Sequence, residues 1–423
     1  MSIEVPLSPA VQERLRDLGQ VDLVVGIPSF NNSRTIGHVV RAAAAGFAKY
    51  FPGKRAVIVN SDGGSQDGTP EVVAAADFSS PGAILVAYPL APVQKIITPY
   101  QGIPGKGSAF RTIFAIARRL SARACAVVDS DLRSITPEWV QLLLGPVLQE
   151  SFDYVAPLYL RHKYDGTITN SIVYPLTRAL YGQEVRQPIG GDFGFSGRLA
   201  AHYLTKPVWE TNVARFGIDI WMTTTAIADG FKVCQAFLGA KIHDAKDPGA
   251  DLAEMLVQVV SSVFDLMVVY RERWEEVEGA REVPLFGFPH GVGLEPVSVN
   301  LERMLGIFRQ AARDLGEVWQ QALAPETLAH VVALGKETGP FRFPDALWVR
   351  AVYDFAVAYE RRALPSEQLL RSLVPLYLAR TASFVLQTAE SGAEEVEGVI
   401  RGLADEFVRQ KGYLRERWTA PSR

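Results

Sequence analysis

The chain has 423 residues, 48% of them hydrophobic and 21% charged, which is the composition of a globular protein long enough for two or three domains. Its formal net charge is −3 with acidic and basic residues interspersed, so nucleic acid and anionic membrane surfaces are excluded as expected partners. Only Cys125 and Cys234 occur, both in apolar runs, which predicts buried thiols and a cytoplasmic protein rather than a disulfide framework.

Residues 1–20 alternate charged and apolar residues at helical spacing, which predicts a short leading helix and no signal peptide. The most apolar later stretch, residues 255–270, is flanked or interrupted by Asp251, Glu254 and Asp265. It is too short and too charged to span a membrane, so we expect no membrane contact.

Apolar strand-like runs alternate with helical patterns up to residue 160. Strands are predicted over 21–30, 55–62, 83–90, a run ending at Asp129, and 153–160. Helices are predicted over 35–50, after Asp62 and after Lys106. This alternation is typical of an α/β fold with a Rossmann-like, mostly parallel sheet.

The pattern changes in the second half of the chain. Helices are predicted over 170–181 and 218–228 and a last strand over 232–243, before an almost entirely helical region made of 252–278, 301–323, 325–334, 346–361, 367–390 and 393–411. We therefore predict a leading helix (1–20), an α/β domain (21–250) and a helical domain (251–423), with 283–296 as a hinge. The predicted helices of this domain have more apolar faces than a single layer of helices packed on the sheet would bury, which favours a homodimer.

Asp129 and Asp131 follow the buried run Ala124–Val128, at the edge where ligands bind to open α/β sheets. Two carboxylates suit Mg²⁺ or Mn²⁺, and Mg²⁺ keeps coordination positions for water and substrate phosphates. The motif therefore predicts a metal site that serves a nucleoside diphosphate. A helix-capping turn is the alternative.

Two further loops carry candidate nucleotide contacts. Asp62 opens a loop with three glycines that could hold a base or ribose, or could simply cap the next helix. Gly105 and Lys106 open a helix, where backbone N–H groups and the lysine favour a phosphate over a solvated loop. The spacing is not that of a P-loop.

Three other side chains stand where packing alone would not select them. His243 ends a strand-like run and could complete the coordination of a divalent ion, although a lone histidine is more often structural. Asp192 follows Gly190 and Gly191, and Asp219 stands at a helix start, where an N-terminal cap is the alternative. The two carboxylates could bind sugar hydroxyls or accept a proton.

The polar run after the fifth predicted strand could bind a small anion. Arg161 can hold a carboxylate with two hydrogen bonds, and Gly166, Thr167 and Thr169 offer hydroxyl and N–H groups at the next helix start. A surface loop is the alternative.

The ordered motifs IPSFNN, SDGGSQDGT, PGKG, VVDSD, QPIGGD, FGID and KIHDAKDPG span about residues 21–275. In this order they resemble the retaining GT-A glycosyltransferases that make hexosyl-glycerate solutes, namely mannosylglycerate synthase and the glucosyl- or mannosyl-3-phosphoglycerate synthases. The resemblance implies a GT-A domain followed by a helical domain that covers the acceptor. It also implies a nucleoside diphosphate hexose as donor.

The resemblance assigns a role to each candidate. Asp131 and His243, with Asp129 beside them, would hold the Mg²⁺ or Mn²⁺ ion. The nucleotide would meet Pro28, Ser29, Asn31, Asp62, Gly105, Lys106, Asp129 and Ser130. The catalytic set would be Asp192, Asp219 and Lys106. Sugar and acceptor would meet Arg161, Gly166, Thr167, Thr169, Gly190, Gly191 and Asp192.

Two departures bear on the acceptor. The relatives that use 3-phosphoglycerate carry a basic residue where Thr167 stands, and loss of a charge-assisted contact favours free D-glycerate here. Arg161 or Lys163 could compensate. Asp192 stands where the family has the longer glutamate. We therefore expect hexosyl transfer to the 2-hydroxyl of D-glycerate, with 3-phosphoglycerate as the alternative acceptor.

Two other functions are compatible with the sequence. A sugar nucleotidyltransferase also pairs a parallel sheet with Asp-bound Mg²⁺, but its first loop is normally rich in glycine, and IPSFNN has none. A sensor that binds a sugar nucleotide without catalysis is the second. The donor could be a glucosyl or a mannosyl nucleotide.

Overall fold

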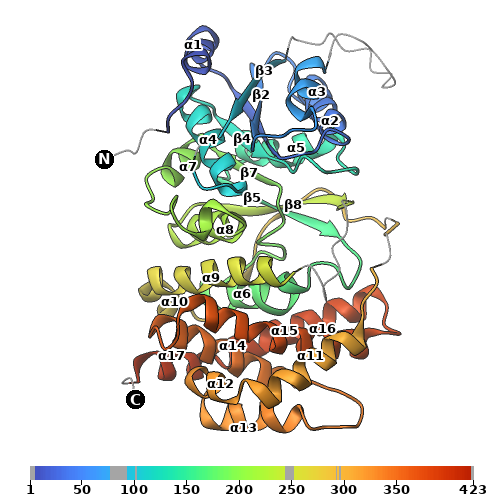
Figure 1. The fold of residues 1–423 in the computed structure, drawn as a ribbon. Helices are drawn as coiled ribbons and strands as arrows, with labels where there is room; N and C mark the ends of the chain where they lie inside the picture. The colour runs from blue at the N-terminus through green and yellow to red at the C-terminus, as the bar shows by residue number, and fades with distance from the viewer. Residues whose placement is uncertain are drawn as a thin grey trace. The chain divides into compact units, whose positions relative to one another are not determined.

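The computed structural model describes residues 5–76, 93–100, 102–242, 252–291, 293–294 and 297–420. The chain forms two compact units, each built from several segments (Figure 1). The sheet unit contains Met1–Leu160, Ile189–Asp244 and Val283–Leu294, and the helical unit contains Arg161–Pro188, Ala245–Glu282 and Glu295–Arg423. The sequence predicted a single domain boundary at residue 250, and the two units differ from it in two places. Residues 161–188 lie in the helical unit, and residues 283–294 lie in the sheet unit.

The sheet unit is organised around eight strands in the order β10-β8-β5-β7-β4-β1-β2-β3. Their bounds are β1 Leu23–Ser29, β2 Ala56–Asp62, β3 Gln94–Pro99, β4 Ala124–Val127, β5 Tyr154–Leu160, β7 Phe193–Ser196, β8 Val233–Ala240 and β10 Leu285–Phe286. Every pair is parallel except those made by β7, which runs antiparallel to both β4 and β5.

Helices cover both faces of this sheet. They are α1 Pro9–Leu18, α2 Ile36–Tyr50, α3 Thr69–Ala75, α4 Lys106–Arg119, α5 Pro137–Gln149, α7 Gly197–Tyr203, η2 Asn212–Ala214 and α8 Ile218–Ala228. In β1, Val25 and Ile27 pack with α2 and α5, whereas Gly26 faces Ile113 of α4. A β-carbon at Gly26 would lie 2.5 Å from the Ile113 side chain, so the glycine lets α4 approach the sheet closely.

Among its described residues, the helical unit contains η1, ten α-helices and one small sheet. Its elements are η1 Thr169–Val173, α6 Tyr174–Tyr181, β6 Gln183–Glu184, α9 Ala253–Val269, α10 Arg271–Glu276, β9 Arg281–Glu282, α11 Leu301–Asp314, α12 Gly316–Ala322, α13 Pro325–Leu334, α14 Asp345–Glu360, α15 Ser366–Thr388, α16 Ala393–Arg409 and α17 Lys411–Thr419. Strands β6 and β9 pair in parallel. In this unit α14, α15 and α16 are packed together (Figure 1).

The predicted fold class, a mostly parallel α/β sheet followed by a helical region, is confirmed. The predicted strand over 83–90 lies outside the described residues, and β3 follows it at Gln94–Pro99. The antiparallel strand β7 and the helix α17 were not predicted. Strand β7 is short and contains Gly194, which packs against the Leu143 carbonyl, so it carries little strand propensity of its own.

One helix among the described residues, α15, is long and apolar enough to cross a membrane by length and composition. Most of that stretch, 83%, is buried inside the protein, as expected for a core helix. The apolar segment 255–270 noted in the sequence consists of most of α9 and the residue that follows it, Tyr270. Most of α9 is buried as well.

Candidate active site

The loops that follow β1, β2 and β4 are tied together at the carboxyl edge of the sheet. Ser130 Oγ donates to Asn32 Oδ1 at 2.8 Å, and Thr35 Oγ1 donates to the Ser130 carbonyl at 2.8 Å. Asn32 N–H in turn donates to Thr69 Oγ1 at 2.9 Å. Ser130 is therefore buried and held at the point where a ligand of this edge would bind.

Asp62 ends β2 and accepts four hydrogen bonds. Its Oδ1 accepts from the backbone N–H groups of Gly64 and Ser65 at 2.9 and 2.7 Å, and its Oδ2 accepts from the hydroxyls of Ser29 and Ser65 at 2.7 Å each. The side chain is buried and fully engaged. Asp62 therefore fixes its own loop and does not cap α3, whose N-cap is Gly68, and its engaged oxygens disfavour direct contact with a base.

Asn31 shapes the first loop through its backbone as well as its side chain. Its φ of 55° lies in the left-handed region, which asparagine tolerates better than most residues. Its N–H donates to Ser65 Oγ at 2.8 Å, and its Oδ1 accepts from Gln66 N–H at 3.0 Å. Pro28 pairs in register with Ser61 across β1 and β2, so both predicted loop residues lie at this edge.

Lys106 is the first residue of α4 and points to two carboxylates. Its Nζ lies 2.7 Å from Oδ1 of Asp129 and 3.4 Å from Oδ1 of Asp219, and it also donates to the Gly191 carbonyl at 3.3 Å. Burial acts to lower the pKa of Lys106, but Asp129 and Asp219 outweigh it and raise that pKa above its usual range. Lys106 therefore stays charged.

Gly105 and Gly107 allow the start of α4 to pack on residues 213–215. A β-carbon at Gly105 would lie 2.5 Å from the Ala214 carbonyl oxygen, and one at Gly107 would overlap the Val213 carbonyl oxygen. The Gly107 N–H donates to the Arg215 carbonyl at 3.2 Å. These glycines therefore allow the backbone at the start of α4 to lie close to the backbone of residues 213–215, whether or not this helix start also binds a ligand.

Asp129 lies between two lysines just after β4. Its Oδ1 faces Lys106, and its Oδ2 accepts from Lys241 Nζ at 2.7 Å. Burial acts to raise the pKa of Asp129, but the two ammonium groups outweigh it and hold that pKa well below its usual range. The carboxylate is therefore ionised at any ordinary pH.

Asp192 is completely buried and both of its oxygens are engaged. Oδ1 accepts from the backbone N–H of Asp129 at 2.7 Å, and Oδ2 accepts from Lys241 Nζ at 2.8 Å and from the Tyr159 hydroxyl. Asp192 thus fixes the backbone of Asp129. These contacts favour a positioning role over proton abstraction from an acceptor.

Gly190 and Gly191 supply the space and the carbonyls that this cluster needs. The Gly190 carbonyl accepts from Lys241 Nζ at 2.9 Å. Gly191 has a φ of 92°, and a β-carbon there would lie 2.5 Å from Oδ2 of Asp129 and 2.8 Å from Lys241 Nζ. Only glycine adopts this positive φ readily and also leaves room for the side chains of Asp129 and Lys241.

Asp219 is the second residue of α8, and Gly217 is the N-cap, so the carboxylate does not serve as the predicted cap. Its Oδ1 is buried and has no hydrogen-bond partner among the described residues, although Lys106 Nζ lies 3.4 Å away. Burial raises the pKa of Asp219 above its ordinary value, and Lys106 opposes this. Asp219 is therefore the carboxylate of this cluster with acceptor capacity to spare.

The predicted metal ligands are only partly described. Asp131 lies two residues beyond Asp129 in a turn and is half-buried. His243 lies outside the described residues, and within the described ranges no group of three or more His, Cys, Asp and Glu side chains has metal-binding geometry. The residue types present nevertheless suit a hard cation, since Asp129, Asp131 and Asp219 carry carboxylate oxygens.

The predicted acceptor loop belongs to the helical unit. Gly166 has a φ of 73°, and a β-carbon there would meet Arg161 Nη1 at 3.5 Å and Thr169 Oγ1 at 3.9 Å, so these three residues lie together. The buried Thr167 is different, because its hydroxyl is 2.5 Å from the Tyr377 hydroxyl of α15. Lys163 Nζ donates to the carbonyls of the α15 end, Thr388, Ala389 and Ser391.

Two residues of the charge cluster were missed in the sequence. Lys241 follows β8 directly and its side chain is 5% exposed, while Tyr159 lies in β5. A lysine that ends an apolar strand two positions before a candidate ligand was a usable signal for Lys241. Tyr159 gave none, because a tyrosine in an apolar strand looks like an ordinary core residue.

The chain is similar to one kind of known protein. No family model matches the chain. Over 257 residues it is 27% identical to glucosyl-3-phosphoglycerate synthase of Mycolicibacterium smegmatis, covering 56% of this chain and 75% of that protein. Two crystal structures of glucosyl-3-phosphoglycerate synthase from Mycobacterium tuberculosis are 20% identical. One holds Mn²⁺, UDP and glucosyl-3-phosphoglycerate, and the other Mn²⁺, UDP-glucose and phosphoglyceric acid.

The matches to these two structures cover 60% and 61% of this chain, and 83% and 84% of the chains in those structures. Each match has a TM-score of 0.43, which is too low to establish a shared fold by itself. The ordered motifs resemble those of the GT-A glycosyltransferases that make hexosyl-glycerates, and the mostly parallel α/β sheet is compatible with that class. Within that class the similarity of the chain is to glucosyl-3-phosphoglycerate synthase.

Proposed function

We propose that the chain is a metal-dependent retaining hexosyltransferase that moves glucose or mannose from a nucleoside diphosphate sugar to the 2-hydroxyl of a glycerate-type acceptor. The observation that carries this proposal is the cluster of Lys106, Asp129, Asp192, Asp219 and Lys241 beyond β4. It lies at the sheet edge where α/β folds bind nucleotides, in a chain similar to a glucosyl-3-phosphoglycerate synthase.

The charges of this cluster suit a diphosphate leaving group. Asp129 and Asp131, with His243, are the proposed ligands of a divalent cation, which supplies Lewis-acid stabilisation of the departing diphosphate. Lys106 is held at the start of α4, where its ammonium group and the helix N-terminus both favour negative charge. Asp192 and Lys241 are proposed to fix Asp129, and Asp219 to bind a sugar or acceptor hydroxyl.

Neither Asp192 nor Asp129 is arranged as a covalent nucleophile. Asp192 is engaged on both oxygens, and Asp129 is held between two lysines. We therefore favour attack from the face of the leaving group. The departing phosphate then accepts the proton of the acceptor hydroxyl, and Lys106 neutralises the charge that develops on it.

The acceptor proposed first is 3-phosphoglycerate, because the curated relative is named for it. Arg161, beside Gly166 and Thr169, is the proposed phosphate contact. Thr167 bonds to Tyr377, and Lys163 Nζ donates to three backbone carbonyls. Free D-glycerate remains the second candidate, favoured by the absence of a basic side chain at Thr167.

The experiment is a transfer assay with Mn²⁺ or Mg²⁺. It crosses UDP-, ADP- and GDP-glucose and GDP-mannose with 3-phosphoglycerate and D-glycerate, and products are identified by mass. Product with 3-phosphoglycerate supports the first acceptor, and product with glycerate alone supports the second. No product with either, together with pyrophosphate release from a sugar phosphate and a nucleoside triphosphate, would replace this proposal with a nucleotidyltransferase.

An Arg161→Ala variant separates the two acceptors further. It should raise KM for 3-phosphoglycerate far more than KM for glycerate, whereas Lys163→Ala is the matched control in the same loop. A homodimer and a cytoplasmic location stay predictions, and sedimentation velocity would test the first.

A further inference from the structure

Helix α15 packs against the loop that carries the proposed acceptor contacts. The hydroxyl of Tyr377 in α15 lies 2.5 Å from the hydroxyl of Thr167, and both side chains are buried. About two turns further along the same helix, the Val385 carbonyl accepts a hydrogen bond from the Tyr164 hydroxyl at 3.3 Å. The loop is therefore fixed to α15 at two of its residues.

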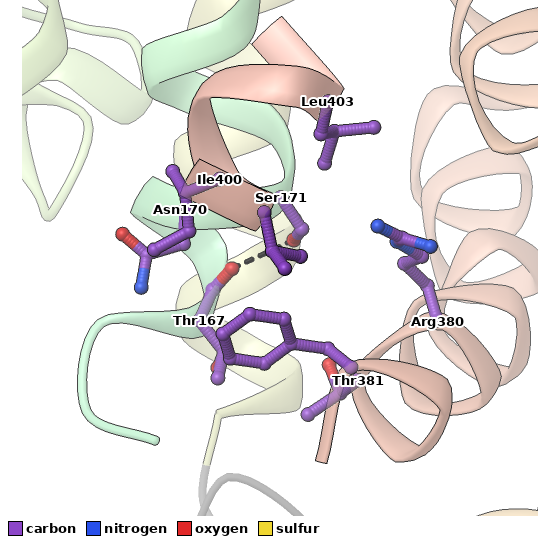
Figure 2. A pocket seen from close by; sticks show the side chains of 9 residues that line it. Thr167, Asn170, Ser171, Arg380, Thr381, Ile400 and Leu403 are labelled. Atoms are coloured by element: carbon purple, nitrogen blue, oxygen red, sulfur yellow. Dashed lines mark hydrogen bonds between the residues drawn. The ribbon is translucent and has the colours of Figure 1, made fainter. Parts of the chain in front are cut away.

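Thr167 is held through its backbone as well as through its hydroxyl. Its carbonyl accepts from the Ser171 hydroxyl at 2.6 Å, the bond drawn as a dashed line in Figure 2. The Ser171 carbonyl in turn accepts from Trp348 Nε1 at 2.8 Å. Thr167 also lines the interior cavity shown in Figure 2, which has about 20 Å³, room for a water molecule. The Thr167 side chain thus faces the interior of the helical unit.

The turn that follows this loop has an uncommon conformation. The element η1 is a π-helix, closed by a hydrogen bond from the Tyr174 N–H to the Thr169 carbonyl. Such turns are rare and occur mostly at functional sites. Residues distant in sequence hold this one, because Trp348 binds Ser171 and Arg186 Nη1 donates to Asn170 Oδ1 at 2.9 Å. Tertiary contacts therefore determine where this helix start lies.

We propose that Tyr377 is a positioning residue of the acceptor site, an inference that rests on the transferase function proposed above. Tyr377 holds Thr167 inward, so that Arg161, Thr169 and the backbone N–H groups of the helix start are arranged for the acceptor before it binds. Thr167 itself does not contact the acceptor. Without the Tyr377 hydroxyl, the buried Thr167 hydroxyl loses its partner, and acceptor binding must then supply the free energy that orders the loop.

The test is steady-state kinetics of Tyr377→Phe, varying whichever acceptor the wild type uses, 3-phosphoglycerate or D-glycerate. The KM for this acceptor should rise about three- to tenfold, the effect of losing one hydrogen bond of ordinary strength. Both kcat and the KM for the nucleotide sugar should change by less than about twofold, because the lost interaction serves acceptor binding.

Tyr353→Phe is the matched control. Tyr353 is a buried tyrosine of the same unit, but its hydroxyl donates to the Phe407 carbonyl of α16 at 2.6 Å. Urea unfolding should show a similar loss of stability in the two variants. The acceptor KM should rise only in Tyr377→Phe.

Thr167 tests the pair from its other side, and does so even if Tyr377→Phe does not fold. Thr167→Val removes the hydroxyl and should raise the acceptor KM as Tyr377→Phe does, whereas Thr167→Ser keeps a hydroxyl and should raise it less. The double variant Tyr377→Phe/Thr167→Val should raise the acceptor KM by less than the product of the two single effects, because neither hydroxyl is then left unpaired.

An unchanged acceptor KM in folded Tyr377→Phe or Thr167→Val would overturn this role. Equal losses in kcat and in the KM for the nucleotide sugar, or the same rise in acceptor KM in Tyr353→Phe, would show general damage and overturn it as well. Absence of transfer by the wild type with every donor and both acceptors is a different result, since it would overturn the proposed function and this inference with it.

Discussion

The ammonium group of Lys241 lies 2.7 Å from Oδ2 of Asp129 and also 2.8 Å from Oδ2 of Asp192. The Asp192 side chain is fully buried, and it accepts a second bond from the Asp129 backbone. Lys241 is thus the group that allows two carboxylates to lie side by side. The position of Asp129, and of any ligand it binds, depends on a lysine that contacts both.

Lys241→Met should destabilise the protein and disturb the site together. Removing a buried, charge-assisted donor should lower the free energy of unfolding by about 1.5–3 kcal/mol, measured by urea unfolding. It should also weaken nucleotide sugar binding, measured by calorimetry. Lys206→Met is the matched control, since Lys206 pairs with Asp229 at 2.7 Å but is 28% exposed. Equal stability of the two variants would contradict this role.

Gly191→Ala should abolish the arrangement around Asp129. The new β-carbon would lie 2.5 Å from Oδ2 of Asp129, so the carboxylate must move, and a displacement of about 1 Å can cost about 100-fold in rate. Gly230→Ala is the control, because Gly230 also has a positive φ, 80°, but no atom lies within 4 Å of a β-carbon there. Both variants carry the backbone penalty, and the transfer rate should fall steeply only in Gly191→Ala. A similar small loss in both would show that Asp129 tolerates the shift.

The sequence allowed the local elements to be predicted because their signals are local. Helix α8 was predicted over 218–228 and is observed at Ile218–Ala228, since a run of apolar residues follows a glycine at its start. The strands β1, β2 and β5 were predicted to within two residues at either end because buried parallel strands are continuous apolar runs. The pairing of β7 between β4 and β5 depends on contacts distant in sequence and could not be predicted in this way.

The candidate site shows the same difference between features with local sequence signals and features that depend on distant contacts. Lys106, Asp129 and Asp219 were selected for their places at element ends, and the structure places Lys106 Nζ 2.7 Å from Asp129 and 3.4 Å from Asp219. The engagement of Thr167 with Tyr377 could not be predicted, because 210 residues separate them in the chain. A short polar motif indicates which residues could bind a ligand, but tertiary packing decides which of their atoms remain available.

Asp131→Ala should eliminate metal-dependent transfer. Loss of one hard ligand removes several kcal/mol of charge stabilisation from the leaving group, which corresponds to a rate loss of about 1,000-fold. Mn²⁺ titration followed by electron paramagnetic resonance should show weakened binding in the same variant. Asp17→Ala, an exposed carboxylate of α1, is the control. A nearly normal rate with Mn²⁺ would remove Asp131 from the metal site.

Asp354 is the buried carboxylate on which the helical unit depends. It is 0% exposed, accepts from the Ala324 N–H at 2.9 Å, and binds the Tyr413 hydroxyl at 2.7 Å and Arg417 Nε at 3.1 Å. Asp354→Ala leaves three half-buried donors without their charged acceptor and should cost about 3–5 kcal/mol of stability in urea unfolding. The exposed Asp314→Ala should change stability by less than about 0.5 kcal/mol. A loss below 1 kcal/mol for Asp354→Ala would mean that water replaces the carboxylate.

Lys411 should make the stability of the helical unit vary with pH in the alkaline range. Its buried ammonium group donates to the Val277 carbonyl at 2.6 Å, and burial, with Arg415 nearby, lowers the pKa of Lys411 to about 8. In the unfolded chain a lysine has a pKa of about 10.4, so between these values the unfolded state binds more protons. The free energy of unfolding therefore gains a contribution from this residue that rises from pH 8 to about 10.4 and is constant below and above that window.

The check is urea unfolding of the wild type and Lys411→Met at several pH values from 7 to 10.5. The difference in unfolding free energy, wild type minus variant, should increase with pH across the window, because only the wild type loses the cost of burying a charged ammonium group. Lys54→Met, at a surface lysine that is 42% exposed, should follow the wild type in its pH dependence. A flat difference would mean that Lys411 keeps an ordinary pKa in the folded protein, and a difference that falls as the pH rises would mean that folding raises its pKa; either result would contradict this prediction.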